Sequence, residues 1–186
     1  LLTGEMGETE IAVFCPTTLY RLGGDLGPTI RVAEHLRDLA EFDVLDELLI
    51  TDGALSGRYK ALVILQGDFV DKPILDAIEK WVRAGGHLIL SVPKPVCDVE
   101  GQRWTAGDLG KGKVSLVGYD KDEKKWMEAL APVIRPHAKY DGVMDGVRTT
   151  RRGRETLLYN GTDDAIISKA GSREVEVAPH SIVSVR

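Results

Sequence analysis

The segment from Gly57 to Val92 constrains the fold more than any other part of the chain, because it spells strand, turn, helix, glycine pair and strand. Ala61 to Leu65 is an apolar, β-branched run that is too short for a helix, and the turn-forming residues Gln66-Gly67-Asp68 follow it. A second apolar run, Leu88 to Val92, comes directly after Gly85-Gly86. A strand-helix-strand unit of this length predicts the βαβ crossover of a parallel sheet.

The helix between these two strands has a defined start and one apolar face. Asp71 and Pro73 mark the start, because a proline in the first turn of a helix loses no hydrogen bond there. The apolar residues recur at helical spacing and share one face: Ile74, Ile78, Trp81 and Val82. We therefore expect Trp81 to pack against the sheet.

The same alternation of elements extends towards both ends of this unit. Apolar runs predict three further strands: Glu10 to Cys15, Phe42 to Leu45 and Val114 to Val117. Two further helices are expected to begin at Pro28-Thr29 and at Asp120, which with Glu123 resembles a capping box. Pro132 and Pro136 are expected to end the second helix. This order predicts a doubly wound α/β layer structure.

The sequence period changes after residue 139. Five short strand-like runs follow, separated by turn-forming pairs: Val143 to Thr150, Glu155 to Tyr159, Ala165 to Ser168, Arg173 to Val177 and Ile182 to Val185. They predict a small antiparallel β unit, so we divide the chain into an α/β domain of residues 1–139 and a β domain of residues 140–186. A unit of this size has a weak core, so it is expected to pack on the α/β domain or on a partner outside the chain.

Charge and composition exclude several classes of protein. The net charge of −5 argues against nucleic-acid binding, which needs a basic footprint. The basic cluster around Gly153 is interpreted as the solvated tip of a hairpin: Arg148, Arg151, Arg152 and Arg154. No apolar run approaches the roughly 20 residues of a membrane span, so no membrane partner is predicted.

The cellular address is left open by the sequence. No signal peptide is visible, and because the chain begins at Leu1 rather than at a methionine, we interpret it as a domain cut from a longer polypeptide. The cytoplasm is slightly favoured. The two cysteines, Cys15 and Cys97, are too few for a disulfide scaffold and are expected to be reduced.

Ligands of an open parallel sheet lie outside the carboxyl ends of its strands. This rule places the candidate ligand or interface residues in the loop from Pro16 to Gly27 and directly after the third strand: Tyr20, Arg21, Gly23, Gly24, Gln66 and Asp68. The glycines fit neither a dinucleotide fingerprint nor a P-loop, so a flexible loop is favoured over a phosphate cradle.

The same loop carries residue types that are common in interfaces. Tyr and Arg are enriched at binding hot spots, so we expect the loop to project towards a partner subunit or a neighbouring catalytic domain. The alternative, at even weight, is that Leu19 and Leu22 fold back onto the core and anchor the loop.

No complete catalytic constellation is visible in the sequence. Cys97 lacks the small neighbours and the following helix of a nucleophile elbow, and Cys15 ends a strand, so both are weak nucleophile candidates. The histidines are dispersed, and no metal site or cofactor is predicted: His35, His87, His137 and His180. Four carboxylates flank the second strand and are interpreted as a solvated edge: Asp43, Asp46, Glu47 and Asp52.

Two phrases, DGALSGRYKALVIL and DAIEKWVRAGGHLIL, resemble the class I glutamine-amidotransferase-like domain. The resemblance implies a flavodoxin-like, doubly wound, mostly parallel sheet. Catalytic members carry a cysteine elbow after the strand that corresponds to Leu88–Val92, followed later by His-x-Glu. Here the first position reads Ser91-Val92-Pro93-Lys94, and neither His137 nor His180 has the acid. The resemblance therefore implies the domain without its activity.

A degenerate form of this domain is similar to the middle domain of family 42 β-galactosidases and related glycoside hydrolases, where it follows a barrel and helps to build the oligomer. Arg154 to Thr162 and Val175 to Val185 resemble the small C-terminal β domain of these hydrolases. The resemblance implies a non-catalytic accessory region of a glycoside hydrolase, partnered by copies of itself or by a catalytic domain, with carbohydrate as a candidate ligand. The alternatives are a stand-alone cysteine hydrolase and a small-ligand-binding α/β module that uses the loop 16–27.

Overall fold

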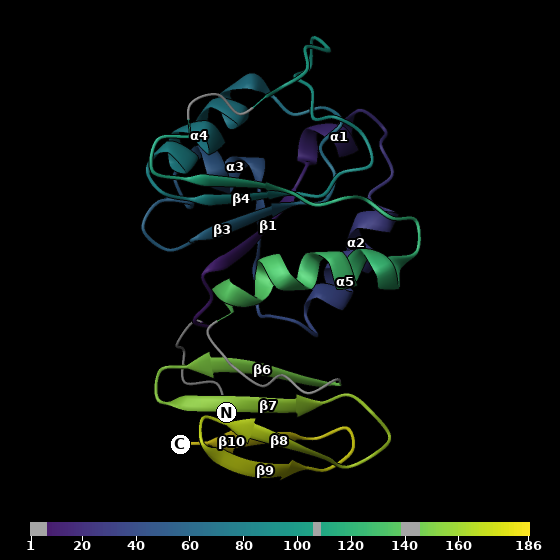
Figure 1. Cartoon of the computed structure of the whole chain (residues 1–186), viewed down its shortest axis with the longest axis vertical. Coiled ribbons are helices and arrows are strands. Elements are labelled where there is room, and N and C mark those ends of the chain that lie inside the picture. Colours follow the sequence, from purple (N-terminus) through teal and green to yellow (C-terminus); the bar gives the residue numbers. More distant parts are fainter. Residues whose placement is uncertain (1–6, 106–108, 139–145) are drawn as a thin grey trace.

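The computed structural model of the chain describes residues 7–105, 109–138 and 146–186, which form an α/β unit and a smaller β unit (Figure 1). The α/β unit is built on five strands in the order β2-β1-β3-β4-β5, and every neighbouring pair is parallel. The strands are β1 (Ile11–Cys15), β2 (Asp43–Asp46), β3 (Ala61–Ile64), β4 (His87–Leu90) and β5 (Lys113–Leu116). The predicted α/β class and parallel sheet are confirmed.

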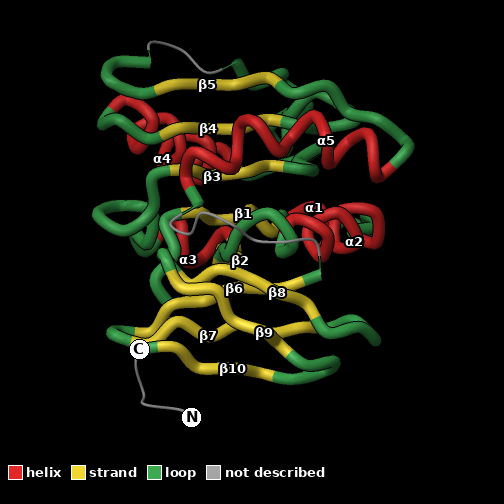
Figure 2. Tube along the Cα trace, turned by 60° about the horizontal axis from the view of Figure 1, so that its bottom comes forward, coloured by secondary structure: helices red, strands yellow, loops and turns green. Residues whose placement is uncertain are grey.

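Helices cover both faces of this sheet (Figures 1 and 2). Helices α2 (Gly27–Leu36) and α5 (Glu123–Ile134) pack on one face, and α3 (Glu47–Thr51) and α4 (Lys72–Arg83) pack on the other. Side chains of β3 alternate between the two cores, and all four of its residues are buried. A strand that is buried on both faces is apolar throughout. The continuous apolar run in the sequence therefore predicts β3.

The glycine pair after α4 has the role that the sequence predicted. Gly85 adopts a φ of 122°, a conformation that ends the helix at little cost for glycine alone. Trp81 is only 7% exposed and lies so close to Gly86 that a Cβ atom there would overlap the indole ring. The pair therefore both stops α4 and makes room for its largest core side chain.

Two short helices lie in segments that were expected to lack helical structure. Helix α1 (Thr17–Arg21) occupies part of the loop 16–27, and α3 directly follows β2. The side chain of Asp46 caps α3 by accepting a hydrogen bond from the Leu49 amide at 2.8 Å. Five residues are too few to show helical periodicity, so only the capping residue pointed to α3.

The boundaries predicted for α5 are wrong at both ends. Asp122, rather than Asp120, caps this helix by accepting from the Lys124 amide at 3.0 Å. Pro132 lies inside α5, which continues to Ile134 and is followed by a short 3₁₀ helix, η1 (Arg135–His137). A proline removes one backbone hydrogen bond from a helix, and the buried Leu130 and Ile134 hold the last turn against the sheet despite that loss.

The β unit contains two small antiparallel sheets (Figure 2). Strands β6 (Val147–Arg152), β7 (Glu155–Asn160) and β10 (Ile182–Val185) pair in the order β10-β7-β6, and β8 (Ile166–Ala170) pairs with β9 (Arg173–Val177). Its core centres on three fully buried residues: Val147, Leu158 and Val177. The first residues of the predicted strand Val143 to Thr150, and the proposed boundary at residues 139 and 140, lie outside the described residues.

The β unit contacts the α/β unit through β6. Packing on the α/β domain was one of the two predicted alternatives, the other being packing on a partner outside the chain. The Glu8 amide donates to the Arg151 carbonyl at 2.9 Å, and Arg148 Nε lies 3.4 Å from the Asp38 carboxylate. None of the helices in the described part of the chain is long and apolar enough to cross a bilayer.

Replacement of Trp81 by Ala tests the packing of α4 on the sheet. We expect Trp81→Ala to lower the free energy of unfolding by about 3–5 kcal/mol, because a large core aromatic leaves a cavity behind. Leu116→Ala is the control, since Leu116 is 80% exposed and its loss should cost less than about 0.5 kcal/mol. Urea titration measures both. Equal effects of the two substitutions would contradict the placement of α4.

Candidate functional site

The strand order reverses at β1, because the chain passes from β1 to β2 on one side and returns to β3 on the other. In open α/β sheets such a reversal creates a crevice outside the carboxyl ends of the two central strands. Here the crevice is approached by three segments, namely the loop 16–27 after β1, the start of α3, and the residues after β3. These segments hold most of the predicted site residues.

Gln66 bridges the crevice at the end of β3. Its Oε1 accepts a hydrogen bond from Thr29 Oγ1 on α2, and its Nε2 donates to the Asp25 carbonyl at 2.9 Å. Both polar atoms of the amide are therefore engaged by the protein. The geometry gives Gln66 a role in anchoring the loop ahead of α2 to the sheet.

Glu47 is a buried carboxylate that holds α1 in place. It is 6% exposed and accepts hydrogen bonds from Thr17 Oγ1 at 2.9 Å, from Thr18 Oγ1 at 2.6 Å and from the Thr18 amide at 3.1 Å. A buried charge needs such donors, and the first turn of a helix offers free amides for it. The interpretation of Glu47 as part of a solvated edge is thus wrong.

Two of the other three carboxylates around β2 are also engaged, whereas Asp52 is exposed, as the sequence predicted. Asp43 lies 2.8 Å from Arg58 and accepts from the Tyr59 hydroxyl at 2.7 Å, and Asp46 caps α3. The sequence signal that was available for this group is the acidic pair Asp46-Glu47 directly before the apolar run of α3, which is a helix-start pattern.

Some side chains of the loop 16–27 are buried against the protein, and others are exposed to solvent. Leu19 is 5% exposed and packs against Gly24, whose amide donates to the Leu19 carbonyl at 2.9 Å. Gly23 has a φ of 83°, which glycine alone adopts easily. Tyr20, Arg21 and Leu22 are exposed, with Tyr20 at 68%. One of the two anchoring leucines therefore folds back and the other does not.

Asp68 links the loop after β3 to the segment after β4. Its Oδ2 lies 3.0 Å from Lys94 Nζ, and its backbone carbonyl accepts from the Cys97 amide at 3.2 Å. Its Oδ1 is buried and has no hydrogen-bond partner among the described residues. The contacts on both sides make Asp68 a connecting residue of this edge.

Neither cysteine has the surroundings of a nucleophile. Burial, followed by the nearby carboxylates of Asp46 and Glu47, raises the pKa of the Cys15 thiol, which keeps it protonated. Cys97 forms isolated β-bridges with Phe69 and Arg103 instead of standing on an elbow. In the described part of the chain, no histidine is hydrogen-bonded to either thiol.

Two of the dispersed histidines meet at the opposite end of the sheet. His87 Nδ1 lies 2.7 Å from His137 Nε2, and His87 Nε2 lies 2.8 Å from Ser115 Oγ. Burial lowers the pKa of His87 to about 4, with further contributions from His137 and Lys113, and burial also lowers the pKa of His137. Sequence analysis missed this cluster because its members are far apart along the chain.

The order Ser115, His87, His137 has the connectivity of a nucleophile, a base and an orienting group. A reacting site also needs space for a substrate beside the nucleophile. Four cavities in the described part of the chain are lined by other residues. We therefore assign a structural role to the cluster, whose hydrogen bonds connect β4, β5 and η1.

The outer side of the α/β unit near β2 exposes a group of large apolar side chains. We give the name apolar edge surface to the residues of this group, which lie on α1 or directly after it, on α2, on β2 and on α3, and which are between 42% and 68% exposed: Tyr20, Leu22, Ile30, Val44, Leu48 and Leu49. Ile30 and Val44 also line a mostly apolar cavity of about 220 Å³ between α2 and β2. An exposed apolar surface beside an edge strand is typical of a protein interaction site.

The fold is a known one among carbohydrate-active enzymes. The chain superimposes with a TM-score of 0.72 on a cold-adapted β-galactosidase from Rahnella sp. R3, over 98% of its own length and 41% of that chain, with 12% identity. A GH42 β-galactosidase from G. stearothermophilus gives 0.65 over 96% and 40%, with 9% identity. A β-galactosidase from Bacillus circulans sp. alkalophilus gives 0.63 over 98% and 42%, with 12% identity.

The chain spans about two fifths of the length of these solved structures. At such low identity the likeness establishes the fold alone. It matches the part of the sequence resemblance that concerns β-galactosidases, whereas the amidotransferase-like label stays a prediction. No protein-family model matches the sequence, and the search of curated proteins found no significant relative.

The two cysteines can be tested for a role in hydrolysis. We expect the chain to show no turnover of glutamine or aryl esters, and Cys15→Ala and Cys97→Ala to leave that baseline unchanged, because neither thiol has a base. Spectrophotometric assays of all three proteins measure this. Turnover that disappears in either variant would show a cysteine hydrolase.

The histidine cluster makes stability depend on pH. Because the pKa of His87 is lowered from 6.5 to about 4, the unfolded chain takes up a proton in this range that the folded chain does not. The free energy of unfolding should thus fall by about 1–3 kcal/mol between pH 6.5 and pH 4 through this residue.

Urea titrations at several pH values measure this dependence in wild type and in His87→Gln. The slope attributable to His87 should be absent from the variant. His180→Gln is the control, since His180 lies on the surface beside Asp163. An unchanged slope in His87→Gln would contradict the assignment.

Proposed function

We propose that this chain is a non-catalytic accessory region of a larger glycoside hydrolase of the β-galactosidase type. Its α/β and β units support a carbohydrate-active site that another part of the protein supplies, and the α/β unit holds copies of the protein together. The observation that carries the proposal is the match of nearly the whole chain to a partial segment of β-galactosidase chains.

The carboxyl edge of the sheet supports the non-catalytic part of the proposal. The polar side-chain atoms of Gln66 and Glu47 form hydrogen bonds with other residues of the protein. The raised pKa of Cys15 keeps its thiol neutral. A reacting site needs a nucleophile, a base and space for substrate together. The described residues at this edge do not bring a nucleophile, a base and space for substrate together. The cysteine-hydrolase alternative therefore has no support from the geometry.

The finer fold assignment belongs to the same proposal. The strand order β2-β1-β3-β4-β5 with helices on both faces is that of flavodoxin-like sheets, and amidotransferase-like domains elaborate such a sheet. We place the boundary between this domain and the β domain at residues 139 and 140, where the sequence period changes. In this proposal the amidotransferase-like domain retains the parallel sheet with helices on both faces and lacks the catalytic cysteine.

The apolar edge surface is the face that we propose for association. Glu47 fixes α1 beside the start of α3, so Tyr20 and Leu48 are presented by two adjoining helices. Burial of apolar area stabilises an interface by roughly 25 cal/mol per Å², and aromatic and arginine residues such as Tyr20 and Arg21 dominate hot spots. A second copy of this chain is the partner that the proposal assigns to this face.

A charge placed on the apolar edge surface tests association. We expect the double variant Tyr20→Glu with Leu48→Glu to weaken self-association at least about tenfold, because two carboxylates would have to be desolvated on contact. Sedimentation equilibrium over a range of concentrations measures the effect on the 186-residue chain.

The matched control is Ile167→Glu, which alters an apolar residue of β8 that is 62% exposed and lies outside the proposed face. This variant should associate like wild type. A wild-type chain that stays monomeric at every concentration, or an equal effect of control and test variants, would contradict an interface at this edge.

A further inference from the structure

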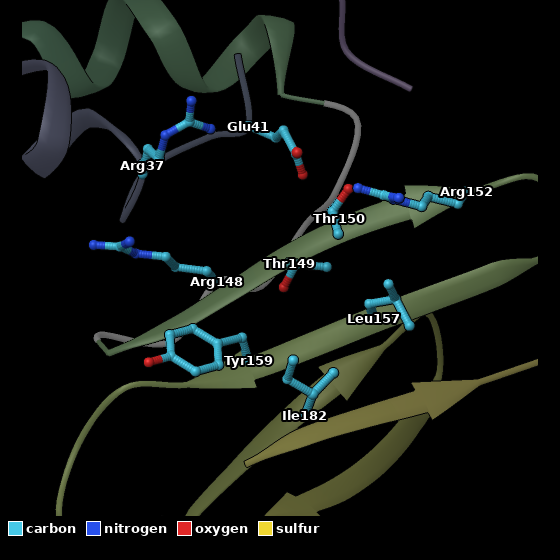
Figure 3. A pocket seen from close by; sticks show the side chains of 9 residues that line it. All are labelled: Arg37, Glu41, Arg148, Thr149, Thr150, Arg152, Leu157, Tyr159 and Ile182. Carbon is cyan, nitrogen blue, oxygen red and sulfur yellow. The ribbon is translucent and has the colours of Figure 1, made fainter. Parts of the chain in front are cut away.

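A cleft of about 350 Å³ lies between the two units (Figure 3). One wall is formed by Arg37 and Glu41, which follow α2 in the α/β unit. The other wall belongs to the sheet of β6, β7 and β10: Arg148, Thr149, Thr150, Arg152, Leu157, Tyr159 and Ile182. The volume lies within the range of about 300–1,000 Å³ that is common for small-molecule sites.

The alternation of side chains along β6 sorts the arginine cluster into two groups. Arg148 and Arg152 share the face that lines the cleft, and Arg151 lies between them in sequence and is directed to the other side, where its Nε donates to the Gly153 carbonyl at 3.0 Å. The interpretation as a solvated hairpin tip is therefore wrong for Arg152, which is half-buried in the wall of the cleft, whereas Arg148 is exposed as predicted and also lines the cleft. Packing of β6 against the α/β unit, which no local pattern reports, makes the difference.

The cleft carries more positive than negative charge. Three arginines line it against the single carboxylate of Glu41. The Arg37 guanidinium stacks 4.2 Å from the centroid of the Phe42 ring, and in the described part of the chain it has no ion-pair partner. Arg148 makes a 3.4 Å contact with Asp38, its sole ion-pair contact among the described residues. Within the described residues, most hydrogen-bond donors of Arg37 and Arg148 therefore have no protein partner.

Two buried polar atoms beside this charge lack partners. Thr150 Oγ1 and Arg152 Nε have no hydrogen bond in the described structure, although both are inaccessible to solvent. Figure 3 shows Arg152 lying along β6 towards Thr150, with Glu41 reaching down to them from the opposite wall. Buried polar groups are normally satisfied, so these two atoms leave the wall beside the arginines with unused hydrogen-bonding capacity.

We propose that this cleft binds a small anionic sugar, in which a carboxylate, sulfate or phosphate is joined to a hydroxyl-bearing ring. Arginine forks bind such oxyanions through charge-assisted, paired hydrogen bonds. Glu41 offers acceptor oxygens for ring hydroxyls, and Tyr159, Leu157 and Ile182 offer an apolar surface for the ring itself. The cleft includes none of the residues of the apolar edge surface, although Arg37 also lines the neighbouring cavity between α2 and β2.

Calorimetric titration of the whole 186-residue chain tests the proposal. The probes are glucuronate, galacturonate, glucose 6-sulfate and glucose 6-phosphate, with galactose as the neutral sugar and inorganic sulfate as the bare anion. We expect at least one charged sugar to bind at least about tenfold more tightly than both galactose and inorganic sulfate. The four charged probes distinguish the carboxylate, sulfate and phosphate sources of the anion.

Three variants locate the site. Arg37→Gln with Arg148→Gln should weaken binding of the preferred probe at least about tenfold, and Arg151→Gln, on the same strand but directed away from the cleft, should bind like wild type. Glu41→Gln should bind more tightly than wild type, because it removes the one carboxylate that the described residues contribute to the cleft. A gain in affinity cannot come from misfolding.

Four outcomes would overturn the proposal. They are no binding of any charged sugar by wild type, equal binding of galactose or inorganic sulfate, an equal loss in Arg151→Gln, and unchanged or weaker binding in Glu41→Gln. Thermal unfolding of each variant confirms that the comparison is made between folded proteins.

Discussion

Burial of the central strands on both faces is the constraint on which the rest of the structure depends. In β3, Leu62 and Ile64 face the core under α4, whereas Ala61 and Val63 face the core under α2 and α5. A strand with apolar side chains on both sides must be covered twice, so helices are required on both faces and the crossovers must alternate. The same arrangement aligns the carboxyl ends of β1 and β3, and it is there that the loops of the unit gather.

The chain uses its own side chains to close this edge. Gln66 ties the loop before α2 to β3, and Glu47 ties α1 to α3. Leaving Glu47 buried without donors would be costly, so the Thr17 and Thr18 hydroxyls and the Thr18 amide are part of the same device. In other sheets of this kind the same edge accepts a ligand. Here its polar side chains instead bind the protein's own loops. We propose two other places for recognition, namely the apolar edge surface and the arginine-lined cleft.

Sequence reasoning succeeded where the determinants are local. The strand, helix, glycine pair and strand around Trp81 follow from apolar spacing, a first-turn proline and the conformational freedom of Gly85, and all of these lie within one short segment. The exposure of Tyr20 and Arg21 in the loop after β1 was also expected. Their role in an interface is still a prediction, as is the role of Gly23 and Gly24 beyond shaping the loop.

The features that escaped prediction depend on partners distant in the chain. Helix α1 is held by Glu47, which follows another strand, and His87 meets His137 only after α5 has crossed the sheet. Arg148 and Arg151 look alike in sequence, and only the packing of β6 on the α/β unit separates them. Such pairings follow from topology and layer packing, which residue types alone do not report.

The central claim, that this chain supports a carbohydrate-active site without supplying its chemistry, is tested most directly by deletion. Aryl β-galactoside hydrolysis and sedimentation would be measured for the full-length product of the gene, for the same product without these 186 residues, and for the 186-residue chain alone. The account predicts hydrolysis by the full-length product, loss of both assembly and most of the activity on deletion, and no hydrolysis by the chain alone. Hydrolysis by the isolated chain, or a deletion that leaves activity and assembly intact, would contradict it.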